Sequence, residues 1–74
     1  MTKEMEFFTF LMEQYAYYKN TTADKILHQL DELNLTDYVF GMYEMYHCEA
    51  IENAFEDIDK LIESKAKETL KNPQ

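Results

Sequence analysis

Histidine and carboxylate side chains occur together at one place in this sequence. His28 is followed by Asp31 and Glu32, three and four residues further on, a spacing that puts them on one side of a helix. Imidazole and carboxylate groups bind zinc, but a zinc site needs three or four protein ligands, and no others point to this place. We therefore predict no metal site, and we interpret His28 as a partly exposed residue in an ion pair with a helical neighbour.

The run His47, Cys48 and Glu49 contains the groups of a nucleophilic site. Consecutive helical positions face different directions, however, so a nucleophile, its base and an orienting group cannot be built from them. Cys48 is reactive if it is exposed at a helix start, where the thiolate is favoured. Otherwise we expect a turn, in which His47 is hydrogen-bonded to a backbone carbonyl and Cys48 packs as a small hydrophobic side chain.

Other catalytic motifs are missing from the sequence. With one Gly and one Cys, it holds no Gly-rich phosphate loop, no nucleophile elbow and no pair of cysteines. We predict that the chain is not an enzyme and uses no cofactor. The alternative is a helical domain that binds a small ligand or a metal, which would be marked by a concave pocket where His28 or His47 meets carboxylates.

Length and composition indicate one helical domain over residues 1–74. The chain is 46% hydrophobic and 30% charged, with one Gly and one Pro, so it is globular and its helices are rarely interrupted. Its single cysteine forms no internal disulfide, and no stretch resembles a signal peptide or approaches the ~18 apolar residues of a membrane span. We expect a soluble, cytoplasmic protein with no membrane partner.

The formal charge of −8, from seven Lys and fifteen acidic residues, constrains the partner. Phosphate backbones and anionic membranes repel such a surface. We therefore predict no nucleic-acid partner, although the second and third helices are joined by a short turn like a helix-turn-helix reader. Charge complementarity favours another protein with a basic surface.

Four helices are predicted from the spacing of the apolar residues. They run over residues 2–19, 23–33, 37–47 and 49–69, and residues 64–74 are expected to fray into a tail. Short connections make neighbouring helices antiparallel. The predicted fold is all-α, a compact bundle of four helices joined by short turns.

Residues between the helices indicate how each one starts and stops. A Thr at 21 or 22 is expected to cap the second helix, and Asn34 to end it in the left-handed conformation, with Leu35 folding back onto the apolar face. Thr36 is expected to cap the third helix. Within that helix, Gly41 lowers helix propensity, and we interpret it as a point where another backbone approaches closely.

The sequence offers more large apolar side chains than so small a bundle can easily enclose. It has six Tyr, five Phe and five Met, and Tyr and Met are enriched at protein interfaces. We predict an aromatic patch, formed by Phe7, Phe10, Tyr17, Tyr18, Tyr38, Phe40 and Met45, that packs against another protein or a second copy of the chain. We also predict an acidic strip on the last helix, formed by Glu52, Glu56, Asp59 and Glu63.

Short motifs along most of the chain resemble a known family. They are Glu13, Tyr15 and Ala16 in the first helix, Tyr38, Tyr43 and His47 in the third, and Asp57, Ile58, Asp59 and Ile62 in the fourth. Over about residues 5–62 the chain is similar to the small bacterial proteins grouped as domain of unknown function 3791 (DUF3791). In that family the histidine is often preceded by Leu and followed by Thr, where this chain has Tyr46 and Cys48.

The resemblance implies a bacterial, cytoplasmic protein with no assigned activity. Family members are often encoded near proteins that look like ADP-ribosyltransferases, so it also implies a partner whose basic cleft this chain masks, as antitoxins mask toxins. By the family pattern Tyr43, His47, Asp57 and Asp59 form a polar cluster, which would also serve to tie the third helix to the fourth. Our leading hypothesis is a small acidic protein–protein interaction or assembly module, a partner or antitoxin-like regulator of a neighbouring gene product.

Overall fold

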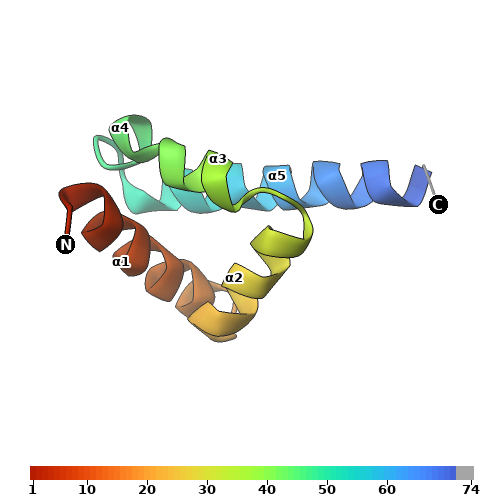
Figure 1. The fold of residues 1–74 in the computed structure, drawn as a ribbon, viewed down its shortest axis with the longest axis horizontal. Helices are drawn as coiled ribbons and strands as arrows, with labels where there is room; N and C mark the ends of the chain where they lie inside the picture. The colour runs from red at the N-terminus through yellow and green to blue at the C-terminus, as the bar shows by residue number, and fades with distance from the viewer. Residues whose placement is uncertain (72–74) are drawn as a thin grey trace.

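The computed structural model describes the backbone of residues 1–71 and the side chains of residues 1–68. Within this range the chain forms five helices and no strand, which confirms the all-α prediction. The helices are α1 (Lys3–Tyr18), α2 (Ala23–Glu32), α3 (Thr36–Gly41), α4 (Tyr43–Tyr46) and α5 (Ile51–Lys71). In Figure 1, α1 and α2 form a V-shaped hairpin on one side, and α3, α4 and α5 lie on the other. None of these helices is both long and apolar enough to cross a membrane.

The prediction of a four-helix bundle is wrong in one place, because the third helix is two helices, α3 and α4. They meet at Met42, whose backbone N–H bonds at 3.1 Å to the carbonyl of Val39, three residues earlier. That bond tightens the last turn of α3, and the neighbouring Gly41 has little propensity to continue a helix. The interpretation of Gly41 as a point of close approach is also wrong, since nothing lies within 4 Å of the position that its Cβ would take.

Asn20 and Asn34 end α1 and α2 in the same way. Both have a left-handed backbone, with φ of 62° and 59°. In each turn the next residue donates a backbone hydrogen bond of 2.8 Å to the carbonyl five residues earlier, which is the pattern of a Schellman motif. The predicted role of Asn34 is therefore confirmed, as is the return of Leu35, which is buried in the core.

Threonine hydroxyls cap the starts of the first two helices. Thr2 and Thr22 each accept a hydrogen bond from the backbone N–H three residues later, at 3.1 and 3.4 Å. The cap predicted for the second helix is thus confirmed at Thr22. The cap predicted at Thr36 is wrong, because Thr36 is already the first residue of α3 and its hydroxyl bonds to the side chain of Asp31.

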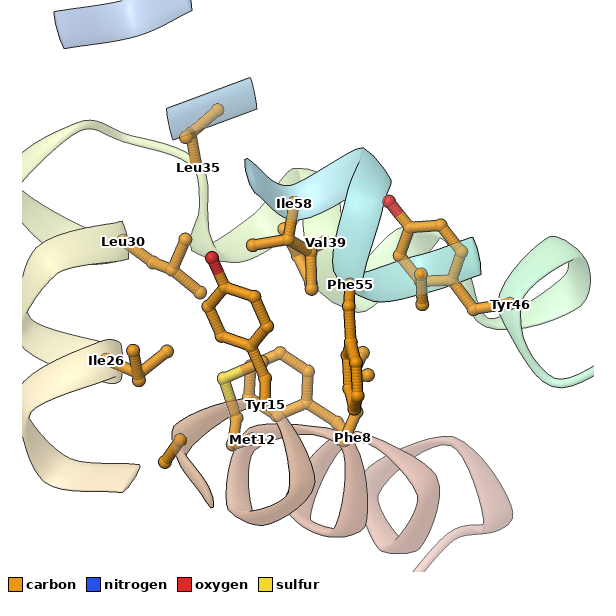
Figure 2. Packing of buried hydrophobic residues seen from close by; sticks show 13 residues of the cluster. Phe8, Met12, Tyr15, Ile26, Leu30, Leu35, Val39, Tyr46, Phe55 and Ile58 are labelled. Atoms are coloured by element: carbon orange, nitrogen blue, oxygen red, sulfur yellow. The ribbon is translucent and has the colours of Figure 1, made fainter. Parts of the chain in front are cut away.

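Thirteen buried side chains, from all five helices and the turn after α2, form one hydrophobic core (Figure 2). They are Phe8, Leu11, Met12, Tyr15, Ala16, Ile26, Leu30, Leu35, Val39, Tyr46, Ala54, Phe55 and Ile58. Five of them come from one face of α1, which contacts α2, α3 and α4. The opposite face of α1 is left outside the core.

The last helix is the longest, and it extends beyond the others in Figure 1. It runs to Lys71, so residues 64–71 are helical where the sequence predicted a frayed tail. The rest of that predicted tail, residues 72–74, lies outside the described residues. An ion pair of 3.5 Å between Glu63 and Lys67, one turn apart, supports this part of the helix.

Candidate functional site

Phe10 and Tyr17 lie on the side of α1 that faces away from the core. They are seven residues apart, which is about two helical turns, so they share one face. Their side chains remain 49% and 85% exposed. Tyr18, beside them, is 54% exposed although its ring stacks on Phe55 of α5 with the ring centroids 4.8 Å apart. We call Phe10, Tyr17 and Tyr18 the aromatic stripe.

Two other rings of the predicted patch are turned toward the core. Phe7 is partly buried and meets the ring of Tyr43 on α4 edge-on, with the centroids 5.7 Å apart. Phe40 is partly buried against Phe8, with the centroids 5.4 Å apart. These two rings join α1 to α3 and α4, so most of their area is used within the chain.

The last two members of the predicted patch, Tyr38 and Met45, lie elsewhere. They are 51% and 58% exposed, and they line a hollow of about 390 Å³ between α3, α4 and the beginning of α5. No ring contact within the described residues joins Tyr38 to the aromatic stripe. We therefore treat this hollow, the α3–α5 hollow, as a second surface; its lining includes Tyr38, Met42, Met45, Glu49, Asn53 and Asp57.

Two buried tyrosines make hydrogen bonds that the sequence did not indicate. The hydroxyl of Tyr15 donates to the carboxylate of Asp59 at 2.5 Å, and that of Tyr46 donates to Asp57. Burial, and then the adjacent carboxylate, raise the pKa of both hydroxyls well above the ordinary value of 10.0, because a phenolate there would be desolvated and repelled. Asp57 and Asp59 thus fasten α5 to α4 and to α1.

The polar cluster of the family pattern is divided in the structure. The rings of Tyr43 and His47 stack with their centroids 4.1 Å apart and an angle of 2° between their planes. Nδ1 of His47 bonds to the backbone carbonyl of Tyr43 at 2.5 Å, which confirms the hydrogen bond predicted for His47. Asp57 and Asp59 do not join this pair, since their partners are the two buried tyrosines.

Cys48 is an exposed free thiol, which corrects its interpretation as a packed hydrophobic side chain. Its Sγ lies 3.7 Å from Nε2 and 3.9 Å from Nδ1 of His47. Both residues lie in the turn that follows α4. Glu49 does not extend the pair, since its carboxylate accepts a hydrogen bond from Asn53 at 3.4 Å.

The members of the acidic strip differ in their exposure. Glu52, Glu56 and Glu63 are exposed on α5. Asp59 is only half-exposed, and besides its bond to Tyr15 it forms an ion pair of 3.1 Å with Lys19 at the end of α1. The strip therefore has three exposed carboxylates, of which Glu63 pairs with Lys67, while Asp59 holds two helices together.

Negative charge is concentrated in one part of the chain. Residues 26–59 contain nine of the fifteen acidic residues and none of the seven Lys, whereas the other forty residues contain six acidic residues and all seven Lys. The first segment includes α3, α4 and the beginning of α5, and so the whole α3–α5 hollow. Those forty residues are together nearly neutral, whereas the segment around the hollow is strongly negative.

His28 lies on the exposed surface of α2. Its Nε2 is 3.2 Å from the carboxylate of Glu32, one turn later, which confirms the predicted pairing with a helical neighbour. The neighbouring Asp31 instead accepts a hydrogen bond from the hydroxyl of Thr36. Among residues 1–71, no three His, Cys, Asp or Glu side chains gather as a metal site would require.

Comparison with known proteins gives one match. A family model described as "Protein of unknown function (DUF3791)" matches residues 6–65. No curated protein and no solved structure matches the chain. The matched range covers all five helices except the two ends, so the family pattern describes this fold as a whole.

Proposed function

Because this chain belongs to the DUF3791 family, whose description gives no activity, we propose its function from its own surface: it is a small acidic module that binds another protein. The aromatic stripe carries the proposal. Phe10 and Tyr17 leave large apolar surfaces in water although the core beneath α1 is complete. Large apolar side chains left exposed on one face of a helix are typical of protein interfaces, and Tyr is enriched there.

The partner that we propose is the product of a neighbouring gene, which the chain would regulate in the manner of an antitoxin. The concentration of acidic residues in one segment supports a partner with a basic surface, since complementary charge speeds encounter and excludes wrong partners. We place this interaction in the bacterial cytoplasm, where a reducing setting suits the exposed free thiol of Cys48.

Co-purification with the neighbouring gene product tests this proposal. We expect the natural chain to retain that protein, and a Phe10→Ser/Tyr17→Ser variant to lose it, because the variant removes two of the three rings of the stripe without entering the core. The matched control is His28→Ser/Glu32→Ser, which changes two exposed residues of α2 and should retain the partner.

The stripe could instead bind a second copy of the chain. Light scattering on the purified chain, over a wide range of concentration, tests this by measuring the oligomeric state. A dimer that the Phe10→Ser/Tyr17→Ser variant abolishes would assign the stripe to self-association. If the chain is a monomer and both variants retain the neighbouring protein equally, the stripe is not an interface and the proposal is contradicted.

A further inference from the structure

We propose that the α3–α5 hollow is the docking site for a basic segment of another protein, with a Lys or Arg side chain seated between Tyr38 and Met45. The inference rests on the proposed interaction function and names a second contact surface and the chemistry of its occupant. It stands on three features: the shape of the hollow, the exposure of its apolar rim, and the charge around it.

Shape provides the first step. The hollow has a volume of about 390 Å³, and its sides come from two directions: α3 and α4 supply Tyr38 and Met45, and the beginning of α5 supplies Asn53 and Asp57. Tyr46 closes the bottom, because it is buried and its hydroxyl is directed toward α5 and bonds to Asp57 (Figure 2). That bond fixes the position of the Asp57 carboxylate beside the hollow.

The rim provides the second step. Tyr38 and Met45 are among the exposed large hydrophobic residues of the chain, each with about half of its surface in water. The aliphatic stem of a Lys or Arg packs well on such side chains, and an aromatic face also attracts the cationic head. A purely polar occupant would leave this apolar rim uncovered.

Charge provides the third step. Glu49 and Asp57 both line the hollow, and within the described part of the chain neither forms an ion pair: Glu49 is bonded to Asn53 and Asp57 to Tyr46. The surrounding residues 26–59 contain no Lys at all. A cationic head that enters between Tyr38 and Met45 therefore meets two carboxylates without competition from the chain's own cations. A second copy, with the same charge of −8, is repelled from this surface.

A short, end-blocked peptide in which Lys and Leu alternate is the probe for this site. Backbone amide shifts in NMR spectra of the full chain locate the bound peptide, and their concentration dependence gives Kd. We expect the largest shifts around Tyr38, Met45 and Asn53. A peptide with Ser in place of every Leu keeps the charge and should bind about tenfold more weakly, because it cannot cover the rim.

Paired variants distinguish binding in the hollow from attraction by the overall negative charge of the chain. Tyr38→Ala and Glu49→Gln change exposed residues of the hollow and should each raise Kd by about fivefold. Tyr17→Ala and Glu52→Gln remove the same groups elsewhere and should change Kd by less than about twofold. Circular dichroism checks that each variant keeps its helices. Asp57 is not substituted, because its bond to Tyr46 supports the fold.

The inference is overturned if Glu49→Gln and Glu52→Gln raise Kd equally. It is also overturned if the Leu and Ser peptides bind with equal affinity. Either outcome would mean that the overall negative charge of the chain holds the peptide. Shifts centred on Phe10 and Tyr17 would also overturn it. Each of these three results leaves the proposed function intact if the Phe10→Ser/Tyr17→Ser variant still loses the neighbouring gene product. The proposed function itself is contradicted only if the chain is a monomer and this variant retains the neighbouring gene product as well as the His28→Ser/Glu32→Ser control does.

Discussion

The hydroxyl of Tyr15 on α1 lies 2.5 Å from the carboxylate of Asp59 on α5, although the two residues are 44 positions apart in the sequence. The bond sits at the end of a row of contacts between the two helices. Tyr18 stacks on Phe55, and Lys19 reaches the same aspartate at 3.1 Å. Two residues before Asp59, Asp57 accepts a hydrogen bond from the hydroxyl of Tyr46. α5 is thereby fastened by one aspartate to the first helix and by the other to the fourth.

Replacing Tyr15 with Phe tests the first of these bonds. The substitution removes the hydroxyl and leaves the ring, so we expect the free energy of unfolding to fall by about 1.5–3 kcal/mol, as is typical for a hydrogen bond to a charged group. Urea denaturation measures the change. Tyr17→Phe is the control, because its hydroxyl is in water, and it should stay within about 0.5 kcal/mol of the natural chain. Equal effects of the two would show that the bond does not stabilise the fold.

Alkaline pH should unfold the chain through the same two tyrosines. The pKa values of Tyr15 and Tyr46 are raised in the folded state, whereas in the unfolded chain their hydroxyls ionise near pH 10. Ionisation therefore favours the unfolded state. The stability that these bonds give is complete below about pH 10 and falls as the pH rises toward the raised values.

Phenolate absorbance and circular dichroism, recorded together during an alkaline titration, check this expectation. The last hydroxyls to ionise should do so as the helices are lost. In a Tyr15→Phe/Tyr46→Phe variant this late absorbance change should disappear. If all the hydroxyls of the natural chain ionise while the helices are still intact, the two bonds are weaker than the structure indicates.

The left-handed backbone of Asn34 predicts opposite effects for two substitutions. A left-handed backbone costs a residue with a Cβ roughly 1 kcal/mol, and Ala lacks the short polar side chain by which Asn offsets that cost, so Asn34→Ala should unfold at a lower temperature. Asn34→Gly removes that cost and should leave the midpoint unchanged or raise it. A midpoint that is the same for Ala and Gly would contradict the left-handed assignment. Asn20 should behave in the same way at the end of α1.

Gly41→Ala should stabilise the chain. Its φ is negative and the space around it is open, so an added Cβ meets no neighbour, while helix propensity improves by about 1 kcal/mol at most. Denaturation in urea gives the change in the free energy of unfolding. If the break at Met42 depends on Gly41, the substitution also makes α3 and α4 more continuous. A loss of stability on substitution would mean that the turn at Met42 needs a glycine before it.

Several local features could be predicted from the sequence because they depend on residues within one or two turns of each other. The caps at Thr22 and Asn34, the return of Leu35 and the pair of His28 with Glu32 are of this kind. So are α1, α2 and α5, each of which the spacing of its apolar residues indicated. The break at Met42 was missed because Tyr38 to Tyr46 is apolar almost without interruption, which hides where one helix ends and the next begins.

The candidate site was only partly predictable. Counting Tyr, Phe and Met indicated a surplus of large apolar side chains, but not which of them the core would take: Phe7 and Phe40 pack inward, while Phe10 and Tyr17 remain in water. The partners of Asp57 and Asp59 were missed for the same reason. Tyr15 and Tyr46 carry no sequence signal that separates them from the other tyrosines until their helices are placed against α5.

By itself the sequence determined the class of the chain, its excess of negative charge, and the positions of most helix ends. These properties follow from composition and from short-range backbone chemistry. Only the tertiary structure decided which face of α1 is covered, which tyrosines reach an aspartate, and where Tyr38 and Met45 meet the acidic beginning of α5. The reason is physical: burial and long-range hydrogen bonds depend on how the helices pack, and packing is a property of the whole chain rather than of any one segment.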